Sequence, residues 1–270
     1  MRESEARPAD SKAHDLHSAN RLFTIHKRHK ETTKAPLKKP SIKFRSVPKE
    51  EITVSATSNV VLQCEAGGNP PPKIHWLKDG ERIAQSVDEL TGVEDIEEGD
   101  VNAHGVLGLS FTRSKLYLDC VQPQDNAVYT CVADNPYNRI ASNTRLTIVN
   151  SINKEIDNEA AASDNSLSLC VSKKNYGSPA RIFMWTHTRL EMIGSSVQLY
   201  CRSSGVPQPI VSWSGPNEDT TIMNSEKYQI LENGDLVVND LSWDDMGSYT
   251  CHVRNQHDSD KISTFLYPTL

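Results

Sequence analysis

Six cysteines carry the best-defined chemistry in this sequence of 270 residues. An even number suits a set of disulfides, and no two of them form the Cys-x-x-Cys pair of zinc ribbons and thiol oxidoreductases. In each half of the chain one cysteine precedes a tryptophan by twelve residues: Cys64 precedes Trp76, and Cys201 precedes Trp213. The chemistry expected at these positions is covalent cross-linking of a folded core.

A second pattern recurs near the end of each half. It reads Asp-x-x-x-Tyr-x-Cys, with Tyr129 and Cys131 in the first half and Tyr249 and Cys251 in the second. Around both patterns lie short segments of alternating apolar and polar residues, bounded by Gly, Pro, Asn or Asp, which are typical of β-strands. The sequence therefore predicts an all-β internal repeat.

The repeat predicts two tandem immunoglobulin-like β-sandwiches of the I-set type. Two facing sheets joined by a disulfide place a cysteine on each central strand, and a tryptophan fills the gap of about 10 Å between the sheets. The tyrosine two residues before the second cysteine is expected to bond back to the chain. The expected bonds are Cys64–Cys131 and Cys201–Cys251, around Trp76, Tyr129, Trp213 and Tyr249. Unpaired core cysteines, as in cytosolic immunoglobulin domains, are the alternative.

The remaining two cysteines do not fit core positions. Alignment of the two halves sets Cys120 opposite Asp240, which predicts an outward-facing polar position, and Cys170 lies between the two halves. An exposed free thiol is a liability in a secreted protein. We therefore expect a Cys120–Cys170 bond that ties the linker to the first domain, with an intermolecular disulfide as the alternative.

Charge is divided unevenly along the chain. The formal net charge is −6, yet residues 1–50 hold thirteen Lys or Arg and six Asp or Glu, which leaves a basic start and an acidic body. Residues 1–45 have too few apolar residues to offset their ordering entropy and are predicted to be a disordered basic segment. The predicted domains are then residues 46–150 and 180–270, joined by a linker over 151–179.

One acidic segment stands out in the first domain. Asp88–Asp100 contains seven acidic residues and no basic one, in a Cys-to-Cys interval longer than that of the second half. It is expected to be a solvated loop, or alternatively a site for a basic ligand or for the basic N-terminal segment.

Neither a membrane span nor a leader is visible in the sequence. No apolar run approaches the ~18 residues of a membrane helix, and residues 1–50 lack a signal-peptide core. The expected localisation is nevertheless extracellular, with the printed start incomplete or belonging to an alternative isoform.

The second half resembles the C-terminal domain of the zwei Ig (ZIG) family of secreted two-immunoglobulin-domain proteins and of the related insect insulin-binding imaginal morphogenesis protein-Late. The matching stretches are Leu190–Leu199, Asn233–Val238, Ser242–Tyr249 and Thr264–Pro268, and Ser114–Cys120 is similar to the family strand that carries an extra cysteine. The resemblance implies a non-enzymatic secreted protein that maintains axon position or binds insulin-like peptides.

The sequence does not favour catalysis. It contains none of the HExxH, GxSxG, P-loop or GxGxxG frames, so we expect no enzyme activity, cofactor, metal or nucleic-acid partner. The main hypothesis is a monomer that binds an extracellular or cell-surface protein; a homophilic adhesion module and an intracellular protein with reduced cysteines are the alternatives. Candidate binding positions are Lys73, His75 and Lys78 in the first domain and the turn over Pro207–Pro209 in the second.

Overall fold

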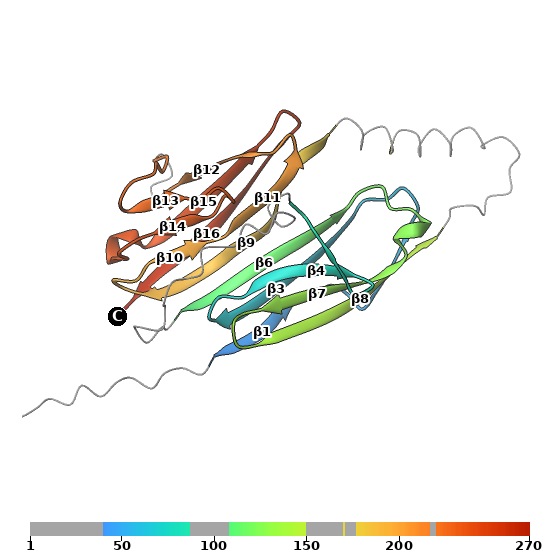
Figure 1. The fold of residues 1–270 in the computed structure, drawn as a ribbon, viewed down its shortest axis with the longest axis horizontal. Coiled ribbons are helices and arrows are strands. Elements are labelled where there is room, and N and C mark those ends of the chain that lie inside the picture. Colours follow the sequence, from blue (N-terminus) through green and yellow to red (C-terminus); the bar gives the residue numbers. More distant parts are fainter. Residues whose placement is uncertain (1–39, 87–107, 150–169, 171–176, 217–219) are drawn as a thin grey trace, which may run out of the picture. The chain divides into compact units, whose positions relative to one another are not determined.

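The computed structural model describes residues 40–86, 108–149, 170, 177–216 and 220–270. Residues 36–270 belong to one compact unit, and the part of it that the structure describes contains β-strands and two short 3-10 turns (Figure 1). The acidic segment 88–100, the N-terminal basic segment before residue 40, and most of the 151–179 linker lie outside the described residues.

The first immunoglobulin domain contains eight described strands. They are β1 Ser41–Ser46, β2 Glu51–Ser55, β3 Val60–Asn69, β4 Lys73–Lys78, β5 Glu81–Ile83, β6 Leu109–Leu118, β7 Ala127–Asp134 and β8 Arg139–Val149. Strands β2-β8-β7-β4-β5 form a five-stranded sheet, while β1, β3 and β6 belong to the facing sheet. Strand β1 begins at Ser41, inside the segment predicted to be disordered, because Ile42 and Phe44 alternate with polar residues and pack against the core.

The second immunoglobulin domain follows with eight further strands. They are β9 Ser178–Met192, β10 Val197–Leu199, β11 Cys201–Val206, β12 Ile210–Ser214, β13 Tyr228–Ile230, β14 Leu236–Val238, β15 Gly247–Arg254 and β16 Ser259–Thr269. Strands β10-β14-β13 form a small sheet. The others join the sheet of β1, β3 and β6, in the order β1-β3-β6-β9-β16-β15-β12, with β11 also paired to β9 (Figure 1).

Each domain has a core built around a disulfide and a fully buried tryptophan. Cys64 is bonded to Cys131 and Cys201 to Cys251. The indole nitrogen of Trp76 donates to Ser114 Oγ at 2.9 Å, and that of Trp213 donates to the Gly234 carbonyl at 2.9 Å. These bonds satisfy polar groups whose burial would otherwise destabilise the core.

Both domains also contain a tyrosine corner. The Tyr129 hydroxyl donates to the Asp125 carbonyl at 3.2 Å, and the Tyr249 hydroxyl donates to the Asp245 carbonyl at 3.1 Å. Each aspartate lies in a 3-10 turn, Pro123–Asp125 or Trp243–Asp245, and its side chain accepts from the backbone three residues earlier. Burial is the main cause that raises the pKa of Tyr129 to about 12.

Candidate functional site

The two domains share one sheet through strands β6 and β9. These strands pair antiparallel, with Leu109 opposite Leu190, Thr112 opposite Thr186 and Ser114 opposite Met184. The opposite edge of β9 pairs with β11 and, in parallel, with β16. Strand β9 therefore joins the domains by a backbone ladder in addition to the chain connection.

The cores of the two domains meet at β9. Residues Ile182 to Thr186 are buried at every consecutive position, which indicates a strand covered on both faces. Phe183 and Met184 pack into the core of the first domain, whereas Ile182 and Trp185 pack into that of the second. The Ile74 amide even approaches Met184 Sδ at 3.5 Å. The first domain is thus completed by side chains of the second.

Charged and aromatic side chains reinforce this junction. The Arg181 guanidinium forms an ion pair of 2.6 Å with Asp119 and lies 4.8 Å from the ring centroid of Tyr117. The Tyr117 hydroxyl donates to the Ile182 carbonyl at 3.3 Å. Burial, followed by the negative charge of Asp260, raises the pKa of Tyr117 to about 12, so this hydroxyl stays protonated at physiological pH.

A buried ion pair lies on β9 near its end. Arg189 and Glu191 are each 2% exposed, and the guanidinium Nη2 donates to Glu191 Oε2 at 2.8 Å. Within the described residues, Arg189 Nε and Nη1, together with the hydroxyl of its register partner Ser110, have no hydrogen-bond partner. Glu191 is therefore the one carboxylate in the described part of the chain that compensates the charge of Arg189.

An exposed aromatic surface crosses the junction. Phe111 on β6 and Phe265 on β16 are both in register with Thr188, so the three side chains share one face of the sheet. Tyr267, two residues beyond Phe265, shares this face and makes an edge contact with Trp243 at 6.2 Å between ring centroids. Phe265, Tyr267 and Trp243 are 44%, 40% and 46% exposed. We name Phe111, Thr188, Phe265, Tyr267 and Trp243 the junction face.

A cluster of charges borders the junction face on the first domain. Arg45 lies over the Phe111 ring at 4.5 Å and also pairs with Glu65 at 3.6 Å. Glu65 makes a second ion pair with Arg113. An exposed apolar surface with a polar rim is typical of sites that bind proteins.

The structure does not bring the three candidate residues of the first domain together. Lys73 and His75 share the outer face of β4. Lys78 lies on the opposite face, the one that carries the buried Trp76, and forms an ion pair of 3.3 Å with Asp125. His75 lies 3.8 Å from Asp134, and burial is the main cause that lowers its pKa. His75 and Lys78 therefore support the local fold.

Cys120 differs from its predicted environment. It is 4% exposed and bonded to Cys170, so the position is buried where an outward-facing one was predicted. The reason is local: Cys120 has a positive φ of 56°, its amide donates to Asn59 Oδ1 at 2.9 Å, and the bonded Cys170 covers it. All six cysteines are paired in the structure, as in proteins of oxidising compartments.

Neither metal nor membrane features are found in the described part of the chain. It holds no cluster of three or more His, Cys, Asp or Glu able to bind a metal ion. No helix there is both long enough and apolar enough to cross a bilayer.

Comparison with known proteins identifies the family. An immunoglobulin-domain model matches residues 39–135, and the immunoglobulin I-set model matches residues 183–267. The chain is 31% identical to zwei Ig domain protein zig-4 of Caenorhabditis elegans over 223 residues, which cover 82% of this chain and 78% of that protein. The chain belongs to the zwei Ig domain family.

Further zwei Ig relatives support this assignment. Zwei Ig domain protein zig-3 of Caenorhabditis elegans is 30% identical over 86% of this chain and 82% of its own length. The neural/ectodermal development factor IMP-L2 of Drosophila melanogaster is 27% identical over 85% and 77%. A crystal structure of IMP-L2 matches the fold with a TM-score of 0.59 at 22% identity, covering 86% of this chain and 96% of that one. This zwei Ig protein thus belongs to a group of immunoglobulin-domain binding proteins that is generally non-enzymatic.

Proposed function

We propose that this protein is a secreted, monomeric binding protein that acts in nervous-system maintenance by holding axons in position. The relationship to zig-4 over 82% of the chain carries the proposal. Three disulfides support an extracellular location. Because immunoglobulin folds serve many functions, the ligand must be assigned by the surface and not by the fold.

The junction face is the surface best suited to a protein ligand. Its partly exposed aromatic residues are large: Phe265 and Tyr267 lie on β16 of the sheet that both domains share, and Trp243 contacts Tyr267 from a 3-10 turn. Rigid aromatic side chains dominate the energetics of many interfaces because they bury much area at a small cost in entropy. Ligand binding here would contact both domains at once.

Binding of an insulin-like peptide is the second candidate function. The resemblance to the insulin-binding imaginal morphogenesis protein-Late, IMP-L2, favours it. A peptide hormone with an apolar surface would fit the same junction face. A homophilic adhesion module would also use an exposed apolar face, but it would self-associate.

The test compares ligand capture by the wild type and by a junction-face variant. Phe265→Asp/Tyr267→Asp places two charges among the exposed aromatic residues, while Met223→Asp alters an apolar side chain that is 73% exposed elsewhere. Neuronal membrane proteins and insulin-like peptides are offered to each in parallel. The proposal predicts that the double variant loses binding by about tenfold or more and that Met223→Asp does not.

The outcome also separates the candidates. Capture of a neuronal surface protein without a peptide hormone supports the first function, and saturable hormone binding supports the second. Concentration-dependent dimerisation in sedimentation equilibrium, abolished by the double variant, would replace both with the homophilic module.

A further inference from the structure

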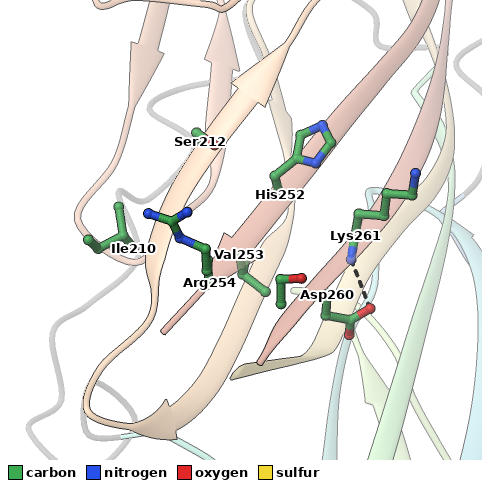
Figure 2. Close-up of a pocket in the computed structure, with 8 residues that line it drawn as sticks. Ile210, Ser212, His252, Val253, Arg254, Asp260 and Lys261 are labelled. Carbon is green, nitrogen blue, oxygen red and sulfur yellow. Dashed lines mark hydrogen bonds between the residues drawn. The ribbon is translucent and has the colours of Figure 1, made fainter. Parts of the chain in front are cut away.

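A second surface feature lies at the far edge of the shared sheet, on strands β12, β15 and β16. It is an open pocket of about 620 Å³ (Figure 2). Two cross-strand rows line it. The first consists of Ser212, His252 and Lys261, and the second consists of Ile210, Arg254 and Ser259.

The charges of this pocket are unusual for the second domain. Described residues 177–270 contain six Arg and Lys residues, and four of them pair with carboxylates: Arg181, Arg189, Arg202 and Lys227. The other two are Arg254 and Lys261, whose side chains have no ion-pair partner among the described residues. Both of these exposed cations line the same pocket (Figure 2).

The one carboxylate in the pocket already serves the backbone. Asp260 Oδ2 accepts from the Ile182 amide at 2.9 Å. Its Oδ1 accepts from the Lys261 amide at 2.8 Å (Figure 2). Neither oxygen is used by the side chains of Arg254 or Lys261. The two cations therefore remain available to an external anion.

The equivalent positions in the first domain carry charges that pair with each other. Counted from the core Trp and Cys, Asp134 corresponds to Arg254 and His75 to Ser212. There Asp134 lies 3.8 Å from His75, and Arg139 lies 3.4 Å from the same imidazole. In the first domain, opposite charges therefore meet at these positions. In the second domain, Arg254 and Lys261 bring positive charge to them.

An apolar and extended surface continues from the cations. Ile210 is 74% exposed, and with Pro207, Gln208 and Arg254 it lines an adjoining pocket of about 400 Å³. Strand β12 is also the last strand of the shared sheet. Its outer edge is occupied at the C-terminal end, where Ser214 is bridged to Thr221 and the Ile222 amide donates to the Trp213 carbonyl, whereas Ile210–Ser212 have no partner strand there among the described residues. Free strand edges can bind extended peptides through their backbone groups.

We propose that this pocket binds an extended acidic peptide segment of a partner protein. A carboxylate would pair with Arg254, the preferred side chain for planar carboxylate recognition, with Lys261 beside it. An apolar side chain of the same peptide would cover Ile210 and Pro207. A sulfated glycan would satisfy the cations but not the exposed isoleucine. The site is separate from the junction face and does not depend on which ligand that face takes.

The test is a titration of the full chain, followed by backbone amide resonances. The probe is a capped hexapeptide of alternating Val and Glu, and the matched control replaces each Glu by Gln. The proposal predicts saturable shifts in Ile210–Ser212, His252–Arg254 and Ser259–Lys261 with the Glu peptide, and at least about tenfold weaker binding of the Gln peptide.

Variants of the pocket sharpen the test. Arg254→Gln/Lys261→Gln is expected to weaken Glu-peptide binding by about tenfold or more. Lys43→Gln, an exposed residue of β1 in the first domain, is the matched control and is expected to leave it unchanged. Lys261→Gln alone is expected to weaken Glu-peptide binding by a few-fold, an effect intermediate between those of the control and the double variant.

Three results would overturn the proposal. One is equal binding of the Glu and Gln peptides, and another is Glu-peptide binding that survives the double variant. The third is a heparin-derived oligosaccharide that shifts these resonances while the peptide does not, which would make the pocket a glycan site.

Discussion

Cys120 and Asp240 occupy equivalent positions in the two domains, and both have a left-handed backbone, with φ of 56° and 46°. Each lies two residues beyond a strand, β6 or β14. The next residue closes the turn in both domains. The Val121 amide donates to the Ser58 carbonyl, and the Leu241 amide donates to the Ser195 carbonyl. The turn therefore forms with either side chain, and Cys120 adds only the covalent link to Cys170.

Removing this link tests its contribution separately from the turn. Cys120→Asp/Cys170→Ser keeps a residue that adopts positive φ and should lower the free energy of unfolding by up to about 4 kcal/mol, the loop-entropy value for about 50 residues. Cys120→Val/Cys170→Ser should cost about 1 kcal/mol more, because a β-branched residue is strained at positive φ. Urea unfolding measures both, and equal midpoints for the two variants would contradict the turn argument.

We expect Met184 to couple the folding of the two domains. Because it completes the core of the first domain from a strand of the second, we expect a single unfolding transition for the wild type. Met184→Asp buries an unpaired charge there, so the first domain should unfold at a lower temperature than the second. Differential scanning calorimetry would show two transitions. Met223→Asp is the exposed control, and an equal effect of both variants would exclude the coupling.

For the Arg189–Glu191 pair, we expect the effects of single substitutions on the free energy of unfolding not to add in the double variant. Glu191→Gln leaves the buried Arg189 guanidinium uncompensated and should cost about 3–5 kcal/mol. Arg189→Met/Glu191→Gln removes both charges and should recover most of that loss. The free energy of unfolding in urea measures the cycle. If the double variant is less stable than Glu191→Gln, the ion pair does not account for the effect.

The lowered pKa of His187 predicts that the folded protein becomes less stable in acid. Burial, and then the positive charges of Arg113 and Arg45, lower its pKa in the folded protein, while Glu65 opposes them. The unfolded chain therefore binds the proton more readily, so this contribution is complete above the ordinary histidine pKa of about 6.5 and is lost as the pH falls below it. His187→Gln should show a smaller drop in urea midpoint between about pH 7.5 and about pH 5 than the wild type. An identical drop would mean that other groups cause it.

The sequence was sufficient for the two cores but not for their junction. Cysteine, tryptophan and tyrosine spacings specify the sandwich because a disulfide and an indole must fit a fixed distance between sheets. The pairing of β6 with β9 depends on which strand edge remains free after folding, and strand periodicity does not encode this. The apolar run Ile182–Trp185 is the signal that could have indicated a strand buried on both faces.

Site residues were harder to predict because strand faces and strand pairing decide which side chains meet. His75 and Lys78 are close in sequence, yet strand parity sends them to opposite faces. Arg254 and Lys261 are seven residues apart, and only the β15–β16 register brings them to neighbouring rows of one face. Which cations remain unpaired depends on distances in the folded chain.

The β6–β9 ladder has a consequence for evolution and engineering. In most tandem immunoglobulin proteins a domain can be exchanged as a module, because few contacts cross its boundary. Here a domain swap between relatives would cut a continuous sheet and leave Met184 facing a foreign core. We therefore expect recombination within the family to preserve both domains together.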